Sequence, residues 1–223
     1  MARGDIKMII GICGFIGSGK DTIADYLVNN HGYRRESFAN TLKDAVASVF
    51  SWDRVMLEGR TKQAREWREQ VDPWWAERLG IPHLTPRWVL QNWGTEVCRR
   101  GFHDDIWISS LENKLRQTKD DVVISDCRFP NEISSIKRQG GLVVRVVRGE
   151  EPEWYNYALS VNRGHEGNIT QALSKRELDN RGIHTSETAW VGTNFDSVLD
   201  NNNTLDNLYN QIEILVQPES VNS

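Results

Sequence analysis

Residues 8–22 read Met8-Ile9-Ile10-Gly11-Ile12-Cys13-Gly14-Phe15-Ile16-Gly17-Ser18-Gly19-Lys20-Asp21-Thr22 and join two different patterns. The first part is a short apolar run rich in β-branched residues, which predicts a strand buried on both faces. After Ser18 the apolar residues recur at helical spacing, at positions 23, 24, 27 and 28. The glycines therefore lie at a turn from a buried strand into an amphipathic helix, which predicts an α/β fold.

The spacing G-x-x-x-x-G-K from Gly14 to Lys20 matches the P-loop, in which backbone N–H groups at a helix start bind phosphate. Lys20 would reach the β- and γ-phosphates of a nucleoside triphosphate. The next position departs from the pattern, because Asp21 stands where a Ser or Thr hydroxyl usually holds Mg²⁺, and Thr22 follows it. A tight turn without a ligand is the alternative, and the flanking strand and helix favour the phosphate site.

A second buried run, from Asp120 to Arg128, predicts a parallel strand that delivers Asp126 and Arg128 at its carboxyl end. Ligands of open α/β sheets bind at this edge. Asp126 could hold Mg²⁺ through water or accept a proton, and Arg128 could bind a phosphate with two hydrogen bonds. A simple salt bridge between the two residues is the alternative. The next helix places Glu132 in its first turn.

Residues 51–86 form a segment of different composition, in which tryptophans alternate with arginines. Aromatic rings and guanidinium groups can stack on a base and bind a phosphate, and Arg65 and Arg68 are the better candidates for this role. Tryptophans at this density also pack small subdomains, so both interpretations stay open.

Three further residues attract attention between positions 40 and 110. Lys43 lies in the first turn of a predicted helix, where a cation opposes the helix dipole, so it is either a surface lysine or a neighbour of an anion. Gly94 interrupts a helical pattern, which indicates that another group comes close to the backbone there. Trp107 continues a helical apolar stripe and is expected in the core.

Composition limits the possible functions. The 223 residues carry a formal net charge of −4, which argues against nucleic acid as the main partner. No 18-residue apolar segment indicates a membrane span, and Cys13, Cys98 and Cys127 lack metal-ligand spacing. We expect a cytoplasmic protein with reduced, mostly buried thiols and no membrane partner. The sequence leaves open whether it forms a homodimer.

The expected organisation is one P-loop domain over residues 1–217 with two elaborations. These are the Trp/Arg-rich helical insertion of residues 51–86 on the substrate side, and a polar, lid-like segment of residues 149–191. The tail of residues 218–223 is expected to be disordered.

Several of these motifs occur together in one family. The order of Gly14 to Thr22, Leu42-Lys43-Asp44, Gln91 with Gly94-Thr95-Glu96, Trp107, Asp126 to Glu132 and His184 to Glu187 resembles that of bacteriophage deoxynucleoside monophosphate kinases. The most specific parts are the Lys-Asp-Thr ending of the P-loop and the Asp126-x-Arg128 strand end followed by Glu132. The resemblance spans nearly the whole chain.

The resemblance implies a three-layer P-loop kinase-like fold with a central, mainly parallel sheet. It also implies transfer of the ATP γ-phosphate, with Mg²⁺, to a deoxynucleoside 5′-monophosphate, in the host cytoplasm if a phage encodes the chain. ATP would be held by Gly14, Phe15, Ile16, Gly17, Ser18, Gly19, Lys20, Asp21 and Thr22. The monophosphate would be surrounded by Lys43, Arg68, Arg87, Trp107, Arg128, Glu132 and Thr185, with Arg65 and Gly94 as further candidates.

Lys20, Asp21, Asp126 and Arg128 are the expected catalytic residues, and Asp21, Thr22 and Asp126 the candidate metal ligands. Phosphoryl transfer depends mainly on positioning and on neutralising charge, which suits these groups. Two alternatives remain: a P-loop kinase for another small molecule, such as a cofactor precursor or phosphorylated metabolite, and an ATP-binding switch that is not a kinase.

Overall fold

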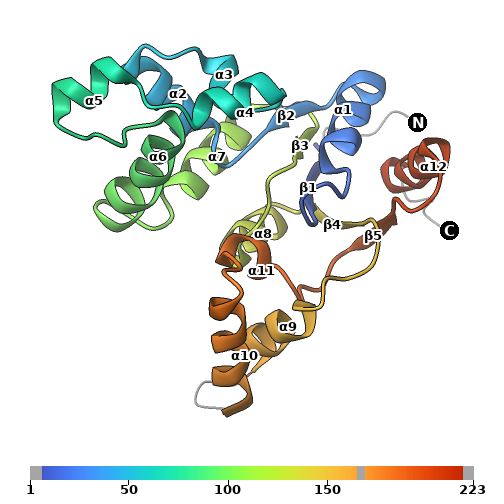
Figure 1. Cartoon of the computed structure of the whole chain (residues 1–223). Helices are drawn as coiled ribbons and strands as arrows, with labels where there is room; N and C mark the ends of the chain where they lie inside the picture. The colour runs from blue at the N-terminus through green and yellow to red at the C-terminus, as the bar shows by residue number, and fades with distance from the viewer. Residues whose placement is uncertain (1–6, 165–168, 218–223) are drawn as a thin grey trace, which may run out of the picture. The chain divides into compact units, whose positions relative to one another are not determined.

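The computed structural model describes residues 7–164 and 169–217 (Figure 1). Its chain divides into two compact units. The sheet unit comprises the described residues up to Ser37 and from Leu115 onward, and the helical unit comprises Phe38–Lys114. The expected insertion, residues 51–86, lies inside the helical unit, and the single-domain organisation stays a prediction. The tail expected to be disordered, residues 218–223, lies outside the described residues.

The sheet unit is built on a five-stranded sheet in the order β2-β3-β1-β4-β5, with every pair parallel. Its central strand β1 is buried at all five positions, as the apolar run predicts. The predicted α/β fold with a central parallel sheet is therefore confirmed. The strands are β1 (Ile9–Cys13), β2 (Arg34–Glu36), β3 (Val122–Ile124), β4 (Leu142–Val147) and β5 (Ser197–Asp200).

Helices cover both faces of this sheet. Ile10 and Ile12 pack with apolar residues of α1 (Lys20–His31) and α12 (Leu205–Val216) in one buried cluster. On the opposite face, α8 (Pro130–Arg138) lies so close that a Cβ on Gly11 would come within 2.5 Å of Cδ1 of Ile136. The alternation of side chains along β1 thus produces the three layers.

The lid-like segment contains more regular structure than the sequence predicts. Its weak periodicity indicates one helix near residues 169–178, and that helix is present as α10 (Ile169–Asn180). The described part also contains α9 (Tyr155–Arg163) and the short α11 (Thr185–Thr188). Trp154 and Trp190, at the ends of these helices, pack on Phe15 of the P-loop with ring centroids 5.3 and 4.7 Å apart. Aromatic packing therefore joins the lid-like segment to the P-loop.

The helical unit has its own core of apolar side chains. Trp52, Trp67 and Trp75 pack against it, whereas Trp74 is 61% exposed. The indole N–H groups of Trp52 and Trp75 bond to Asp72 Oδ2 (2.8 Å) and the Phe50 carbonyl (3.2 Å). Three of these four tryptophans thus pack the unit. The helices are α2 (Asn40–Phe50), α3 (Arg54–Glu58), α4 (Lys62–Arg68), α5 (Pro73–Leu79), α6 (Pro86–Gln91), the π-helix η1 (Asn92–Arg100) and α7 (Ile106–Gln117), which runs on into the sheet unit.

The three cysteines are free thiols. Cys13 and Cys127 are buried free thiols, and Cys98 is a half-buried one, as predicted. None of the helices in the part of the chain that the structure describes has the length and apolarity needed to cross a bilayer.

Candidate active site

The P-loop connects β1 to α1 in the predicted place. No side chain caps the start of α1, and the N-cap residue Gly19 has a left-handed backbone with φ 106°. A Cβ there would lie 2.4 Å from Nδ2 of Asn201, whose amide donates to the Ser18 carbonyl at 2.8 Å. Gly19 is required both for this backbone and for this close contact. The uncapped helix start is a cradle suited to an anion.

Ser18 adds a second indication of a ligand. Its side-chain oxygen is buried and has no hydrogen-bond partner among the described residues. Burying a hydroxyl without a partner is unfavourable. A phosphate oxygen near the loop would supply the missing bond, so the loop fits the triphosphate that its sequence predicts.

Lys20 lies at the centre of this loop. Its ammonium donates to the carbonyls of Gly14 (2.8 Å) and Phe15 (2.7 Å). Burial, and then the positive charge of Arg128, lower the pKa of Lys20 below its usual value. An anion bound in the loop would stabilise the protonated lysine and reverse this effect. The structure therefore brings two predicted catalytic cations, Lys20 and Arg128, to one region of the sheet unit.

Asp21 is held by an arginine of the edge strand β2. Arg35 bonds to the carboxylate of Asp21, to Asp25 Oδ1 (2.7 Å) and to Ser125 Oγ (2.9 Å). The Arg35 side chain is 17% exposed, whereas that of Asp21 is 80% exposed. Arg35 thus links the first turns of α1 to the residue that follows β3 and precedes Asp126.

The two other candidate metal ligands have different surroundings. Asp126 Oδ2 accepts a hydrogen bond from Ser37 Oγ at 2.8 Å. Thr22 lines a cavity on the side of α12, while Asp21 is tied to the β3 end through Arg35. No group of three or more His, Cys, Asp or Glu residues suited to a metal occurs within the described residues. Few protein ligands are expected for Mg²⁺, which keeps several waters and binds through one or two carboxylates together with phosphate oxygens. The oxygen donors of Asp21 and Asp126 fit that chemistry.

Arg128 follows β3 at the predicted edge of the sheet. Its Nη1 bonds to Glu187 Oε1 at 2.8 Å and contacts Ser186 Oγ at 3.4 Å. The ion pair that the sequence suggested as an alternative joined Arg128 to Asp126, whereas the pair observed is with Glu187, a residue of α11. Arg128 therefore connects the strand edge to the lid-like segment.

Glu132 follows Arg128 by four residues and bonds to its backbone, and Thr185 directly precedes Ser186, which Arg128 contacts. Glu132 is buried, and its carboxylate accepts from the backbone N–H of Arg128 (2.9 Å) and of Phe129 (3.1 Å). These bonds cap α8 and shape the turn that carries Arg128. Thr185 precedes Ser186 and lines a cavity of about 640 Å³ that extends from Pro130 between α9, α10 and α11.

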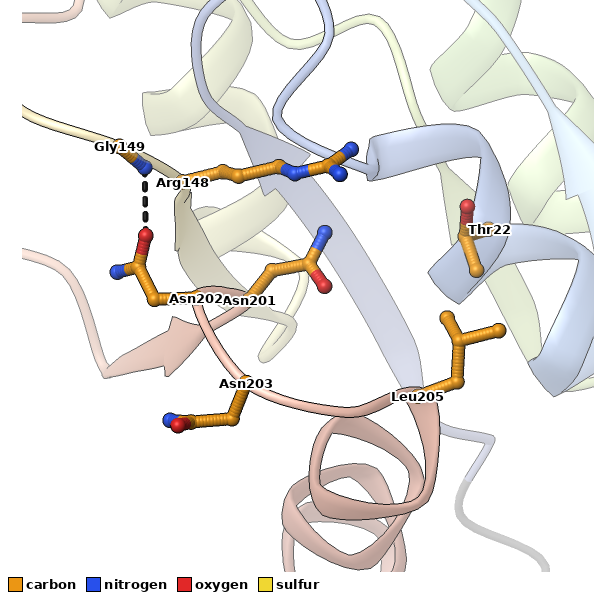
Figure 2. Close-up of a pocket in the computed structure, with 7 residues that line it drawn as sticks. All are labelled: Thr22, Arg148, Gly149, Asn201, Asn202, Asn203 and Leu205. Atoms are coloured by element: carbon orange, nitrogen blue, oxygen red, sulfur yellow. Dashed lines mark hydrogen bonds between the residues drawn. The ribbon is translucent and has the colours of Figure 1, made fainter.

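A second cavity, of about 420 Å³, adjoins the start of α1. Figure 2 shows Arg148 and Asn201, from the ends of β4 and β5, extending towards the helix that carries Thr22. The amide oxygen of Asn202 accepts from the backbone N–H of Gly149 at 2.6 Å and joins the two strand ends. The cavity is bounded by Thr22, Arg148, Gly149, Asn201, Asn202, Asn203 and Leu205.

The helical unit carries the remaining candidate cations. Lys43 is not a solvated lysine, because its ammonium lies 2.7 Å from Glu58 Oε2 and its side chain is 14% exposed. Burial by itself would raise the pKa of Glu58. The hydrogen bond that Lys43 donates to the carboxylate outweighs this effect, and the pKa of Glu58 is below its usual value. Arg87 pairs with Glu69 at 2.9 Å. Lys43 and Arg87 are thus already neutralised within the unit.

Arg65 and Arg68 differ from these two residues. Arg65 Nη1 donates to the carbonyls of Arg60 (2.9 Å) and Gly59 (3.4 Å), and Arg68 Nη1 contacts the Leu57 carbonyl (3.5 Å). Nε of Arg68 is buried without a hydrogen-bond partner in the described chain. Burial, and then the positive charge of Arg87, lower the pKa of Arg68. An anion would stabilise this guanidinium.

Gly94 and Trp107 are close to each other, as the interrupted helix suggested. The indole N–H of Trp107 donates to the Gly94 carbonyl at 3.0 Å, and a Cβ on Gly94 would lie 2.9 Å from Cδ2 of Leu42. Another group therefore does approach this backbone, and Trp107 is buried as expected. Their predicted contact with substrate stays a prediction.

Sequence reasoning missed Arg35, Glu187 and Asn201 as parts of the site. Asn201 belongs to three consecutive asparagines that the sequence presents as a turn. Their position directly after the last parallel strand, at the ligand-binding edge, was the available signal. The contacts of Arg35 and Glu187 join residues 14 and 59 positions apart in the chain, and local patterns contain no sign of them.

Two viral proteins are similar in sequence to this chain over most of its length. No family model matches the sequence. A protein of Acanthamoeba polyphaga mimivirus, provisionally named a deoxynucleotide monophosphate kinase, is 30% identical over 219 residues, covering 92% of this chain and 94% of its own length. The deoxynucleoside-5′-monophosphate kinase of Escherichia phage T5 is 25% identical over 230 residues, covering 79% and 90%.

Among solved structures, the shikimate kinase of Aquifex aeolicus covers 93% of this chain and 95% of its own, with 12% identity and a TM-score of 0.43. That score is too low to add to the assignment, which rests on the two sequence relatives. With a P-loop and a relative that is 30% identical over 92% of this chain's length, the chain belongs to the family of deoxynucleoside monophosphate kinases.

Proposed function

We propose that this chain transfers the γ-phosphate of ATP to a deoxynucleoside 5′-monophosphate, giving a deoxynucleoside diphosphate and ADP. The observation that carries the proposal is the uncapped start of α1 with Lys20 beside it and Arg128 nearby. This set of donors and cations suits a triphosphate and a transferring phosphoryl group. The names of the two viral relatives supply the acceptor class.

ATP would bind along the P-loop, residues 14–22, with its phosphates at the start of α1. The cavity bounded by Arg148 and residues 201–203 lies next to this position and is large enough for a purine. Arg148 can stack on the base, and the amides of Asn201 and Asn202 can bond to its edge. We therefore assign this cavity to the adenosine part of ATP.

Asp21 and Asp126 would hold Mg²⁺ through its water shell, and Thr22 is the less favoured ligand because it faces the adenosine cavity. When bound, Mg²⁺ neutralises charge on the phosphates. Arg35 keeps the carboxylate of Asp21 oriented towards the end of β3.

Candidate ligands of the acceptor monophosphate are Arg128 within the sheet unit and, within the helical unit, Arg68 and Arg65. Lys43 and Arg87 are weaker candidates because each is already paired with a carboxylate. Arg68 has the strongest physical case, because its guanidinium is partly buried and without a carboxylate partner in the described chain. The cavity beside Thr185 is lined by both polar and apolar side chains, which suits the sugar or base of the acceptor.

Transfer then needs little covalent assistance from the protein. Lys20 and Arg128 stabilise charge on the transferring phosphoryl group, and the bound acceptor oxygen is held in line with it. We expect small-molecule nucleotides as its partners and the cytoplasm as its location, which is the host cytoplasm if a phage encodes the chain, and dimerisation stays open.

The test is an ADP-release assay with ATP and Mg²⁺ across deoxynucleoside and ribonucleoside monophosphates, with Lys20→Ala as the inactive control. We expect ADP release that requires a deoxynucleoside monophosphate. Release without any acceptor would instead indicate an ATPase switch, and activity confined to other metabolites would indicate a different kinase. Arg128→Ala should raise the acceptor KM more than the ATP KM.

A further inference from the structure

The turn between α3 and α4 shows an unusual contact between a glycine and an arginine. Gly59 ends α3 with a left-handed backbone, φ 67° and ψ 27°. The guanidinium of Arg68 lies against it, so that a Cβ on Gly59 would come within 2.2 Å of Cζ and 2.3 Å of Nη2. The space occupied by the guanidinium is thus the space that any other residue at position 59 would fill.

Backbone carbonyl oxygens of the same turn accept hydrogen bonds from Arg68 and Arg65. Leu57 accepts from Arg68 at 3.5 Å, and Gly59 and Arg60 accept from Arg65. Carbonyl contacts orient a guanidinium but do not neutralise its charge. The carboxylates of Glu69 and Glu58 are close enough to act on Arg68 electrostatically, but Nε of Arg68 is buried without a hydrogen-bond partner within the described residues, so a donor is left that a bound anion can use.

We propose that Gly59 is a positioning residue for acceptor binding, because its missing side chain lets the Arg68 guanidinium lie against the turn in the orientation that binds the acceptor phosphate. This inference rests on the proposed function, in which Arg68 binds that phosphate. Gly59 itself touches no substrate and acts through Arg68.

A second glycine of the same unit provides a matched control. Gly80 ends α5 with φ 67° and ψ 30°, nearly the same backbone as Gly59, and a Cβ there would meet nothing within 4 Å. Alanine at either position therefore meets the same left-handed strain. Only alanine at position 59 also displaces an arginine. Because the displaced atoms are the far end of a flexible side chain, the guanidinium should move while the fold is kept.

The experiment measures steady-state kinetics and Tm for Gly59→Ala and Gly80→Ala, each alone and combined with Arg68→Ala. We expect both glycine variants to lower Tm by similar amounts. Gly59→Ala should raise the KM for the deoxynucleoside monophosphate about tenfold, with the ATP KM unchanged, as loss of an acceptor contact predicts. Gly80→Ala should leave both KM values within about twofold of wild type. In the Arg68→Ala background, Gly59→Ala should add no more than Gly80→Ala does.

Three results would overturn the inference, and they separate it from the proposed function. If Arg68→Ala leaves the acceptor KM unchanged, the acceptor role of Arg68 fails and the inference fails with it. If Arg68→Ala raises that KM but Gly59→Ala behaves like Gly80→Ala, the proposed function stands and Gly59 has no positioning role. If Gly59→Ala has the same effect with and without Arg68, it acts by another route. Should the alanine variants fold poorly, Gly59→Asn and Gly80→Asn repeat the comparison, since asparagine tolerates the left-handed backbone better.

Discussion

The P-loop of the sheet unit was expected to bind a nucleotide, and the Trp/Arg-rich segment of the helical unit was a candidate for the same role, yet the two regions are built in opposite ways. The P-loop keeps polar groups available: α1 has no side-chain cap, and Ser18 Oγ is unpartnered within the described residues. In the helical segment most aromatic and charged groups are used internally, with Trp75 bonded to Phe50 and Arg87 to Glu69. Residue type alone therefore does not distinguish a binding region from a packed one. Polar groups that are left without a hydrogen-bond partner do distinguish them.

This contrast predicts that P-loop substitutions reduce turnover and leave the stability of the fold nearly unchanged. Core substitutions in the helical unit should instead lower the stability of the fold. The largest effect is expected for Lys20→Ala. It removes a cation that stabilises the transferring phosphoryl group, so turnover should fall about 10³-fold. Its ammonium bonds only to carbonyl oxygens of the P-loop in the described structure, so Tm should change little. Turnover within tenfold of wild type would reject the P-loop assignment.

Asp21→Asn should have the next largest effect, about 10²-fold on turnover at saturating ATP, Mg²⁺ and acceptor. The amide keeps the shape of the side chain and loses its charge. Because the Asp21 side chain is 80% exposed, loss of its ion pair with Arg35 should cost little stability. Near-normal turnover would limit Asp21 to a structural role in the first turn of α1.

Arg35→Gln tests whether the orientation of Asp21 matters, and Arg34→Gln on the same strand is the control. Arg34 pairs with Glu36 instead of the P-loop. If Arg35 positions Asp21, Arg35→Gln should lower turnover and add little to Asp21→Asn in the double variant. Equal effects of Arg34→Gln and Arg35→Gln would contradict this.

In the helical unit, Trp75→Ala should lower the free energy of unfolding by about 2 to 3 kcal/mol, because it removes a ring packed on Phe50. Trp74→Ala is the neighbouring control, since that ring is exposed and should matter little. Denaturant unfolding measures both. If Trp74→Ala instead raises a substrate KM without changing stability, the result would indicate that Trp74 stacks on a base.

The smallest effect is expected for Asn201→Ala, which removes the hydrogen bond to the Ser18 carbonyl and opens space beside Gly19. We expect the ATP KM to rise about tenfold, consistent with the loss of one buried hydrogen bond. Asn203→Ala should be nearly silent, because its amide bonds to Asp200 rather than to the P-loop. Equal ATP KM values for the two variants would show that the hydrogen bond from Asn201 to the P-loop does not contribute to ATP binding.

The sequence by itself determined the strand, the P-loop and the helix within residues 8–30, and the position of Asp126 and Arg128 after a buried strand. These features follow from local periodicity and from the rule that parallel strands place ligands at their carboxyl ends. It also indicated that a group approaches Gly94. Such predictions succeed because each depends on neighbours within a few residues.

Only the tertiary structure decided which polar groups meet. Arg35 bonds to Asp21, Glu187 to Arg128 and Asn201 to the P-loop, contacts that join segments 14 to 183 residues apart. It also decided that Trp75 packs while Arg68 keeps an unmet bonding capacity, although both belong to one segment of uniform composition. Burial and partner choice depend on how the helices and strands pack, and no local pattern contains that information.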